Sequence, residues 1–387
     1  MPTVVVLGAS MAGLPLAHYL SKHLPEKYSV TLVNPSKTFY WNLASPRALV
    51  DPSRMGKKAD DLFLPFLPAF EKYPPGRFTF IHGSATATDP KAHTVTVRSA
   101  DGNDVVVTYE QLVIATGASG AAKGVEWGFK PVRAGNTEEV VAAARAQVAA
   151  AHKIVVSGGG ATGVELAGEI ADRYNGQKQV VLVTAGEDVL DQIPRKDIRA
   201  AANKLLKRLG VEVITGAKVV EETKGASSGV ELVLSDGQRV TADLHIAAWG
   251  LSPNTSYLPN EMLDGSGWVV TDEYMRAKGH QDIWAIGDVT HWGNRKLTTI
   301  EAMHNALVKN LLATVNHKPE TAFAKYEHSD GLLIAVPIGR KFAYSVGFIS
   351  GWKAWGFVGW LLKGLTYMVE YSRPIAEGVW TTGHTKL

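Results

Sequence analysis

Two segments of the chain share one order of apolar, small and polar positions. Each begins with a short apolar run, Thr3–Leu7 in the first segment and Lys153–Ser157 in the second, and a glycine-rich turn follows directly. Beyond the turn, apolar residues recur at helical spacing, and each segment ends in a second apolar run, Val30–Val33 or Val180–Val183. Short apolar runs of this kind predict buried strands, and the spacing between them predicts amphipathic helices. The sequence therefore predicts two strand–helix–strand units and an α/β fold.

The two glycine-rich turns match the G-x-G-x-x-G fingerprint of dinucleotide-binding folds, except at one position. The first glycine of such a turn lets the chain reverse, the second lets a pyrophosphate approach the backbone, and the third lets the helix pack on the strand. Ser10 replaces the second glycine of the first turn, so its side chain must point aside or bind phosphate through its hydroxyl. Because both turns join a predicted strand to a predicted helix, we predict two Rossmann-like domains. The positions concerned are Gly8, Ser10 and Gly13 in the first turn and Gly158, Gly160 and Gly163 in the second.

The residues that follow the second strand of each unit are the expected ribose contacts. An acidic residue usually binds the ribose hydroxyls there, but this chain has Asn34 in the first unit and Thr184 in the second. Asn34 can still hydrogen-bond a ribose. The stretch from Thr184 to Gly186 has neither the acid typical of NADH sites nor the arginine typical of NADPH sites. The sequence leaves the choice between NADH and NADPH open.

Two further apolar runs end in small or acidic residues. The run from residue 112 leads into Thr116 and Gly117, and the run from residue 283 leads into Gly287 and Asp288. In a doubly wound sheet, ligands bind outside the carboxyl ends of the strands. We therefore predict that Asp288 lies beside the first nucleotide site, with capping of the following helix as the alternative.

Composition excludes several kinds of chemistry. The chain has 387 residues, enough for two or three domains, and no cysteine, so disulfides, thiolate metal sites and cysteine nucleophiles are excluded. Any redox chemistry must belong to a bound cofactor, and we expect no metal site. With 40 Lys and Arg against 37 Asp and Glu, the net charge of +3 gives no strong reason to expect a nucleic-acid partner. Since a strand is predicted from Thr3, we expect no signal or transit peptide and a cytoplasmic location, either free or peripheral on an intracellular membrane.

The order of these motifs resembles the flavoprotein superfamily with two dinucleotide-binding folds, and more narrowly the apoptosis-inducing-factor-like oxidoreductases of the ferroptosis-suppressor type. Type II NADH dehydrogenases share the plan more distantly. The resemblance implies that FAD binds the first fold and NADH or NADPH binds a second fold inserted into it. It implies an FAD domain at residues 1–120 and 249–316, an NAD(P)H domain at 121–248, and a small C-terminal α+β domain at 317–387. The segments that carry the resemblance are Lys37–Val50, Gly158–Glu169, Trp249–Asn254, Gly287–Asp288, Lys296–His304 and Gly339–Lys341.

The resemblance also implies roles for single residues near the flavin and the nicotinamide. Asp288 matches the aspartate that binds the ribityl chain, and Glu165 matches a glutamate beside the nicotinamide. The alternative for Glu165 is an acid in the first helical turn that complements the helix dipole. A helix beginning near Leu297, Thr298 and Thr299 is expected to direct its positive end toward the flavin.

Three cations are less firmly placed by the resemblance. Lys296 and Arg47 either add positive charge near the flavin or are ordinary surface cations. Lys123 lies near a position where relatives carry lysine, but the residues that flank it differ.

The last 57 residues, from Gly331, are rich in aromatic residues and carry more Lys and Arg than Asp and Glu. The stretch Val346–Leu365 is apolar but is interrupted by Lys353 and Lys363. A helix lying in the headgroup plane, with tryptophans at the interface and lysines reaching lipid phosphates, fits this pattern. The alternative is a compact third domain whose aromatic side chains fill its own core and a contact with a second copy or with the flavin.

Together these features predict an FAD-dependent oxidoreductase that passes hydride from NAD(P)H to FAD and electrons on to an external acceptor. A quinone at a membrane surface is the acceptor we expect. One alternative is a signalling or interaction flavoprotein of the apoptosis-inducing-factor kind with slow redox turnover. Another is a soluble reductase that uses oxygen or a protein carrier. The oligomeric state stays open.

Overall fold

A seven-stranded sheet forms the main layer of the first fold in the computed structural model, which describes residues 1–120, 127–130, 137–225, 229–293, 295–328, 333–341, 345–349 and 352–381. Its order is β18-β8-β1-β2-β5-β6-β7. The first five strands of this order pair in parallel, and β5, β6 and β7 form an antiparallel meander. The bounds are β1 Thr3–Leu7, β2 Ser29–Asn34, β5 Phe78–Asp89, β6 Thr94–Ser99, β7 Asp104–Thr108, β8 Gln111–Ile114 and β18 Ile283–Ala285.

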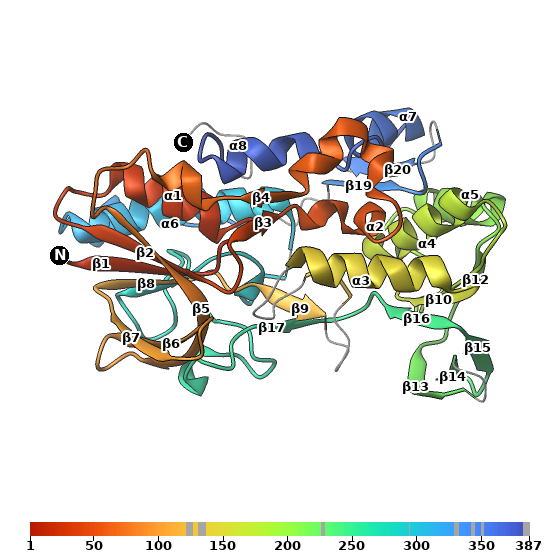
Figure 1. The fold of residues 1–387 in the computed structure, drawn as a ribbon, viewed down its shortest axis with the longest axis horizontal. Coiled ribbons are helices and arrows are strands. Elements are labelled where there is room, and N and C mark those ends of the chain that lie inside the picture. The colour runs from red at the N-terminus through yellow and green to blue at the C-terminus, as the bar shows by residue number, and fades with distance from the viewer. Residues whose placement is uncertain are drawn as a thin grey trace.

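Two helices pack beside this sheet, α1 (Gly13–His23) and α6 (Leu297–Val315), and Figure 1 shows them running next to each other. Val4, Val5 and Val6 of the central strand β1 are fully buried, as expected for a parallel strand covered on both faces. Continuous apolar runs rather than alternation therefore mark these strands in the sequence.

The second fold repeats the plan with a four-stranded parallel sheet in the order β12-β11-β10-β16. Three helices and a separate antiparallel sheet, β13-β14-β15, complete it (Figure 1). The bounds are α3 Thr137–Ala150, β10 Lys153–Ser157, α4 Ala161–Tyr174, β11 Gln179–Val183, α5 Lys196–Arg208, β12 Glu212–Ile214, β13 Val219–Lys224, β14 Val230–Leu234, β15 Arg239–Ala242 and β16 Leu244–Ala247.

The chain enters and leaves the second fold side by side. Strand β9 (Ala118–Gly120) pairs antiparallel with β17 (Leu251–Pro253), so the two crossings are hydrogen-bonded to each other. The second fold is thus inserted into the first, and the α/β class with two Rossmann-like folds is confirmed. The domain boundaries at 120, 248 and 316 stay predictions, and residues 121–126 lie outside the described part of the chain.

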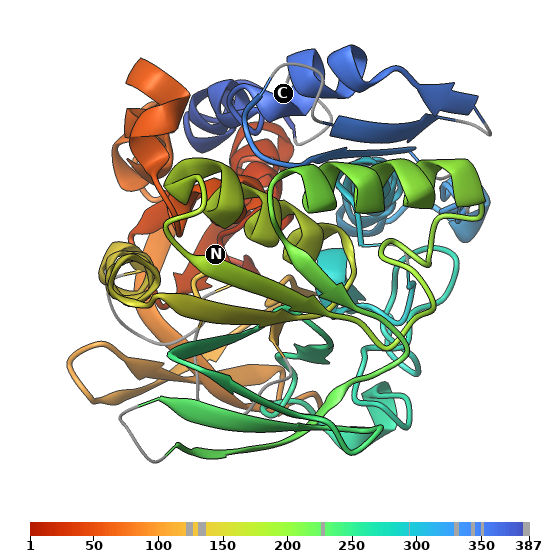
Figure 2. The ribbon, with the colours of Figure 1, turned by 90° about the vertical axis from the view of Figure 1, so that its right-hand side faces the viewer.

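The C-terminal part is a small α+β unit, as expected. Its three-stranded antiparallel sheet packs on α4 and α5, so that helices separate it from the sheet of the second fold (Figure 2). The bounds are β19 Leu333–Pro337, β20 Ser345–Ile349, β21 Trp352–Ala354, α7 Gly356–Gly359, η7 Trp360–Gly364, η8 Val369–Tyr371 and α8 Ser372–Ala376.

Short elements fill the connections. They are β3 Thr38–Tyr40, η1 Asn42–Ala44, α2 Ser45–Ala48, η2 Pro52–Asp61, β4 Phe63–Pro65, η3 Leu67–Phe70, η4 Asn260–Met262, η5 Gly287–Val289 and η6 Glu320–Ala322. The expected helix in the headgroup plane is broken up, since the stretch from Val346 holds two strands, one helical turn and the π-helical segment η7.

His18 anchors the C-terminal end to the first fold. Its ring is buried on α1, stacks on Phe70 at 3.8 Å, and lies 3.2 Å from the carbonyl oxygen of Ala376 through Nε2. Burial, with the nearby Lys72 charge, lowers the pKa of His18 to about 3. The folded protein therefore keeps this imidazole neutral over a pH range in which an unfolded histidine gains a proton.

Because the pKa of His18 is lowered in the folded state, the folded protein should become less stable as the pH is lowered. The unfolded state binds the extra proton below pH 6.5, so the contribution of His18 is complete above that pH and is lost as the pH falls toward 3. Between pH 7 and pH 5 we expect a loss of about 2 kcal/mol from this group. Urea unfolding of the wild type and of His18→Gln, at both pH values and saturating FAD, should show a smaller loss in the variant. Equal losses would contradict the prediction.

Candidate functional site

The first glycine turn is shaped by close contact with the neighbouring strand. Gly8 has φ +104°, and a Cβ there would lie 2.9 Å from the carbonyl carbon of Ala115, just beyond β8. A Cβ on Gly13 would lie 3.0 Å from the carbonyl carbon of Gly8. The Ala9 N–H donates to Oδ1 of Asn34 at 2.8 Å, which ties the end of β2 to the turn. Ser10, at the middle position, is exposed.

The second glycine turn repeats this geometry. Gly158 has φ +121°, and a Cβ there would lie 2.8 Å from the carbonyl carbon of Ala248. A Cβ on Gly163 would lie 3.0 Å from the carbonyl carbon of Gly158. Gly160 differs from both, since its φ of −71° suits any residue and a Cβ there would meet no described atom within 4 Å. Neither packing nor backbone conformation therefore requires glycine at position 160. The turn fits a pyrophosphate at the start of α4, and close approach of such a ligand stays the predicted reason for glycine there.

The ribose candidates stand at the ends of β2 and β11. Asn34 uses its amide within the chain, accepting from Ala9 and donating to the carbonyl oxygen of Ser36 at 2.7 Å. Thr184 is buried against Gly159. Their contact with ribose stays a prediction.

The strands of the first fold bring Thr116, Gly117, Gly287 and Asp288 to one edge. Both β8 and β18 run parallel to β1, so the residues after them gather beside the first glycine turn. The hydroxyl of Thr116 donates to the carbonyl oxygen of Asn254 at 2.8 Å, which ties this edge to the returning chain. A hollow at the edge is lined by Gly287, Asp288, Trp292, Arg295, Thr299, Ile300 and Met303.

Asp288 does not cap the next helix, so that alternative is wrong. Helix α6 begins at Leu297 with Lys296 as its cap residue, and no side chain caps it. The carboxylate of Asp288 instead pairs with the ammonium of Lys130, on the segment that leads into the second fold. Its position in the hollow agrees with the expected ribityl contact, which stays a prediction.

The positive end of α6 lies at the same hollow. Thr299 lines it, Leu297 is half-buried, and Thr298 is exposed. The Gly287 N–H donates to Sδ of Met303 at 3.4 Å, which docks the helix against the Gly-Asp segment. Lys296 is half-buried, and burial lowers the pKa of its ammonium, while its contribution of charge near the flavin stays a prediction.

Glu165 is buried in the second turn of α4, whose first turn in fact holds no acid. The helix-dipole alternative is therefore wrong. Oε1 of Glu165 accepts from Nζ of Lys363 at 2.6 Å, which joins α4 to the C-terminal unit. Burial raises the pKa of Glu165 to about 7, although the Lys363 charge opposes the shift. The carboxyl group can thus hold or release a proton near neutral pH.

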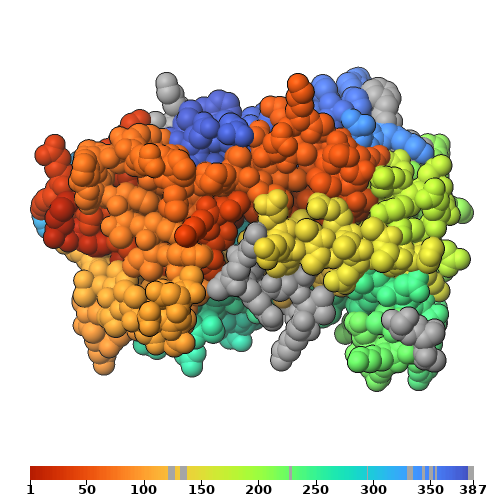
Figure 3. All heavy atoms as spheres, in the orientation of Figure 1, coloured from red at the N-terminus to blue at the C-terminus, as the bar shows by residue number. Residues whose placement is uncertain are grey.

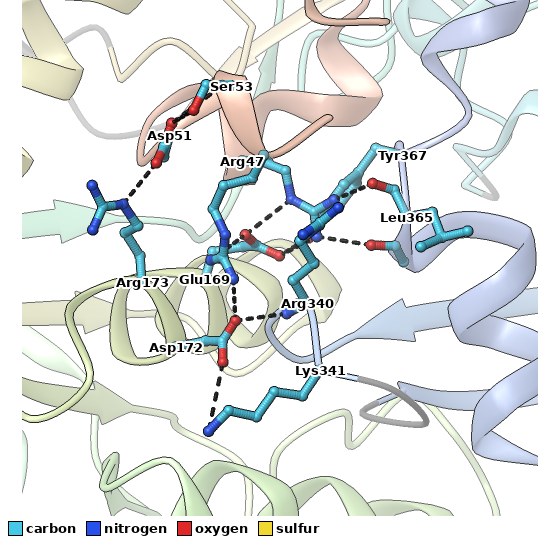
Figure 4. A network of polar contacts seen from close by, with 12 residues as sticks. Arg47, Asp51, Ser53, Glu169, Asp172, Arg173, Arg340, Lys341, Leu365 and Tyr367 are labelled. Carbon is cyan, nitrogen blue, oxygen red and sulfur yellow. Dashed lines mark hydrogen bonds and ion pairs between the residues drawn. The ribbon is translucent and has the colours of Figure 1, made fainter. Parts of the chain in front are cut away.

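Arg47 is fully buried, so the surface alternative is wrong for this residue too. Its guanidinium donates to both carboxylate oxygens of Glu169, at 3.0 and 2.7 Å (Figure 4). It also donates to the carbonyl oxygens of Gly364, at 2.9 Å, and Leu365, at 2.6 Å. The ring of Tyr367 lies 4.8 Å away. Arg47 therefore joins α2, α4 and the C-terminal unit, while its contact with a cofactor stays a prediction.

A wider network surrounds this pair, and sequence reasoning missed it. Arg54 pairs with Asp172, whose carboxylate also accepts from the Arg340 N–H at 2.9 Å (Figure 4). Glu165 and Glu169 lie four residues apart on α4, and both are buried. An acid repeated four residues apart on an otherwise apolar helix face was the sequence signal that could have revealed a buried ionic network here. Lys123 lies outside the described residues.

Two turns of the nucleotide-binding type and one fold inserted into another are typical of a flavoprotein with separate dinucleotide sites. The chain matches the model of the pyridine nucleotide-disulphide oxidoreductase family over residues 2–309, and it belongs to that family. FAD and a pyridine nucleotide, NADH or NADPH, are its cofactors. Because the chain has no cysteine, it carries no active-site disulphide of the kind in the family's name.

Curated relatives confirm the resemblance to ferroptosis-suppressor-type proteins. Oxidoreductase ptaL of Pestalotiopsis fici is 32% identical over 365 residues, covering 92% of this chain and 94% of the relative. Ferroptosis suppressor protein 1 of Homo sapiens is 26% identical, covering 94% of this chain and 91% of the relative.

Solved structures share the fold. The sulfide:quinone oxidoreductase of Aquifex aeolicus superposes with a TM-score of 0.75 at 18% identity, covering 98% of this chain and 92% of that one. NDH2 of Plasmodium falciparum, in complex with NADH, has a TM-score of 0.71 at 14% identity, covering 96% of this chain and 97% of that one.

Proposed function

We propose that the protein is an NAD(P)H:quinone oxidoreductase that works at a membrane surface. The observation that carries this proposal is an apolar face on the C-terminal unit. The residues of this face are exposed to these fractions: 78% for Trp352, 73% for Trp355, 61% for Leu361, 56% for Leu362 and 41% for Phe357. Exposed large apolar side chains in such a group mark an interaction site.

The C-terminal aromatics divide between this face and the interior. Tyr367 is fully buried against Glu169, and the indole N–H of Trp360 donates to the carbonyl oxygen of Arg340 at 2.9 Å. Phe342 and Tyr344 lie outside the described residues. The lysines do not all point outward as expected, because Lys363 pairs with buried Glu165. We therefore no longer expect Lys363 to contact lipid headgroups.

The C-terminal unit runs along the upper edge of the molecule in Figure 3, and η2 rises beside it in Figure 1. Lys57 and Lys58 of η2 are exposed. The segment η2 contacts η8 of the C-terminal unit, and exposed basic residues on a unit with exposed tryptophan and leucine suit the interface of a bilayer. In the described part of the chain, each helix is too short or too polar to cross a bilayer, so we propose contact with one leaflet.

Bound FAD supplies the group that accepts hydride from the pyridine nucleotide and passes electrons to the acceptor. The chain holds it through the first glycine turn and the hollow at Asp288. The second turn holds the nucleotide pyrophosphate at Gly160. Full reduction of a quinone takes up two protons. Burial raises the pKa of the Glu165 carboxyl group, which contacts the C-terminal unit through Lys363, to about 7, so we propose this group as the source of one of them.

Purified protein mixed rapidly with NADH or NADPH and then with a panel of quinones tests the activity. We expect the flavin absorption to bleach within seconds and to return on adding a quinone. Flavin that stays yellow for minutes would contradict the enzyme and favour an interaction protein. Bleached flavin that reacts with oxygen but with no quinone would favour a soluble reductase.

Serine substitutions of Trp352, Trp355, Leu361 and Leu362 together should abolish vesicle binding. Removing this apolar area from the contact should lower turnover of a long-chain ubiquinone in vesicles about tenfold or more. Turnover of a soluble short-chain quinone should stay unchanged. The matched control is Val105→Ser with Val106→Ser, exposed apolar residues on β7. Vesicle binding that survives the fourfold substitution would contradict the membrane contact.

A further inference from the structure

Trp249 is a large aromatic residue left 46% exposed at the edge of the second sheet. It follows β16 closely, and a Cβ on Gly158 would lie 3.2 Å from its own Cβ. The side chain therefore starts beside the first glycine of the second nucleotide turn. The family assignment, the glycine turns and the acid–base pairs leave this indole without a role.

The two folds place a different residue at this same position. A Cβ on Gly8 would lie 2.9 Å from the carbonyl carbon of Ala115 and 3.2 Å from Cα of Thr116. The corresponding distances from Gly158 are 2.8 Å to the carbonyl carbon of Ala248 and 3.2 Å to Cβ of Trp249. The next residue is glycine in both folds, with φ +67° at Gly117 and +66° at Gly250. Trp249 is thus the second fold's equivalent of Thr116, with an indole in place of a small hydroxyl.

Strand order puts this indole at the ligand-binding crevice. From β10 the chain winds through β11 to β12 on one side, whereas β16 pairs with the other side of β10. The order reverses between β10 and β16, and ligands of doubly wound sheets bind outside the carboxyl ends at such a switch point. Gly158 and Trp249 stand on its two sides.

The crevice also fixes which end of the nucleotide Trp249 meets. The ribose next to the adenine binds at the end of the second strand of a Rossmann unit, here Thr184 after β11. Since β16 lies on the opposite side of β10, the other half of the dinucleotide extends toward Trp249. That half ends in the nicotinamide, a flat aromatic ring for which an indole face is a suitable partner.

We propose that Trp249 packs against the nicotinamide–ribose end of the bound pyridine nucleotide and positions it. The inference rests on the nucleotide use that the family assignment gives. Thr116 cannot do the same in the first fold, because its hydroxyl donates to Asn254 and its side chain has no flat face. Trp249 is a binding and positioning residue, and the proposal gives it no part in proton transfer.

Calorimetric titration with NAD⁺, and with NADP⁺ in parallel, tests the contact on the FAD-loaded protein. We expect Trp249→Ala to raise the dissociation constant about tenfold, the loss of a stacked aromatic face. Trp249→Phe should stay within about threefold of wild type, since it keeps a ring. Leu251→Ala is the matched control, because Leu251 is 37% exposed two residues further along, at the start of β17, and this variant should bind the nucleotides as wild type does.

Tryptophan emission gives a second readout that does not depend on turnover. Bound NAD⁺ should protect part of the emission from iodide in the wild type, and Trp249→Phe should lack that protected part. This measurement needs only the phenylalanine variant, so it decides the matter even if the alanine variant fails to fold. Unchanged affinity in Trp249→Ala, or equal protection in wild type and Trp249→Phe, would overturn the proposal. Wild type that binds neither nucleotide would overturn the oxidoreductase function as well.

Discussion

Gly160→Glu should abolish reduction of the protein by NADH and NADPH while FAD stays bound. A Cβ at position 160 would meet no described atom within 4 Å, so we expect the fold to tolerate a side chain there, with its carboxylate where the pyrophosphate is predicted to approach. Like charges in contact cost several kcal/mol, so we expect the rate of flavin bleaching at limiting nucleotide to fall roughly 100-fold or more. Stopped-flow absorbance measures this rate, and the ratio of flavin to protein absorbance reports retained FAD.

Two controls separate the site from general effects of the substitution. Gly265→Glu adds the same group at another exposed glycine with no described atom within 4 Å of its Cβ site, and it should react as wild type does. Gly160→Ala adds only a methyl group and should lose much less than the glutamate variant. Normal bleaching in Gly160→Glu would refute the second fold as the nucleotide site. Loss of FAD in that variant would show that the two folds do not bind independently.

Arg47→Met should be one of the most destabilising single changes outside the glycine turns. It leaves the buried carboxylate of Glu169 without the guanidinium that donates to both its oxygens, and with Arg54, 3.6 Å away, as the cation still beside it. Breaking a buried ion pair by removing one partner costs about 3–5 kcal/mol. We expect a fall of several degrees in the thermal midpoint, measured by circular dichroism at saturating FAD. Glu169→Leu should show a similar fall.

The double variant Arg47→Met with Glu169→Leu should recover part of this loss, because neither charge is then left alone. Recovery should be incomplete, since the carbonyl oxygens of Gly364 and Leu365 lose their donor. Arg98→Met is the control, because its pair with Asp104 is exposed on both sides and should matter little. If the double variant lost more stability than the two single variants lose in sum, this result would contradict an energetic coupling between Arg47 and Glu169. Loss of flavin from folded Arg47→Met, but not from Glu169→Leu, would support the predicted cofactor role of Arg47.

The sequence indicated much of the architecture because apolar periodicity and glycine spacing are local signals. The strands at residues 3–7 and 153–157, and the turns after them, need only neighbouring residues to be recognised. The repeat of an Ala-x-Gly turn at 115–117 and 248–250 was also present, but unequal insertions separate each copy from its glycine turn. Strand pairing alone places Trp249 opposite Gly158.

The charged residues were less accessible to sequence reasoning. Arg47 and Lys363 resemble surface cations in the sequence, and each is buried or nearly so against an acid of α4. Their partners lie far away along the chain, and no local pattern encodes such a pairing. The same holds for Asp288, because its partner Lys130 lies far away along the chain.

The sequence by itself determined the two nucleotide turns, the α/β class and the exclusion of thiol chemistry, because composition and short-range spacing carry that information. Only the tertiary structure decided which charges are buried, which tryptophans are exposed, and that Glu165 meets Lys363 from the C-terminal unit. Burial and pairing are set by contacts between distant segments. The pKa of Glu165 and the surface offered to an acceptor are therefore properties of the packed molecule.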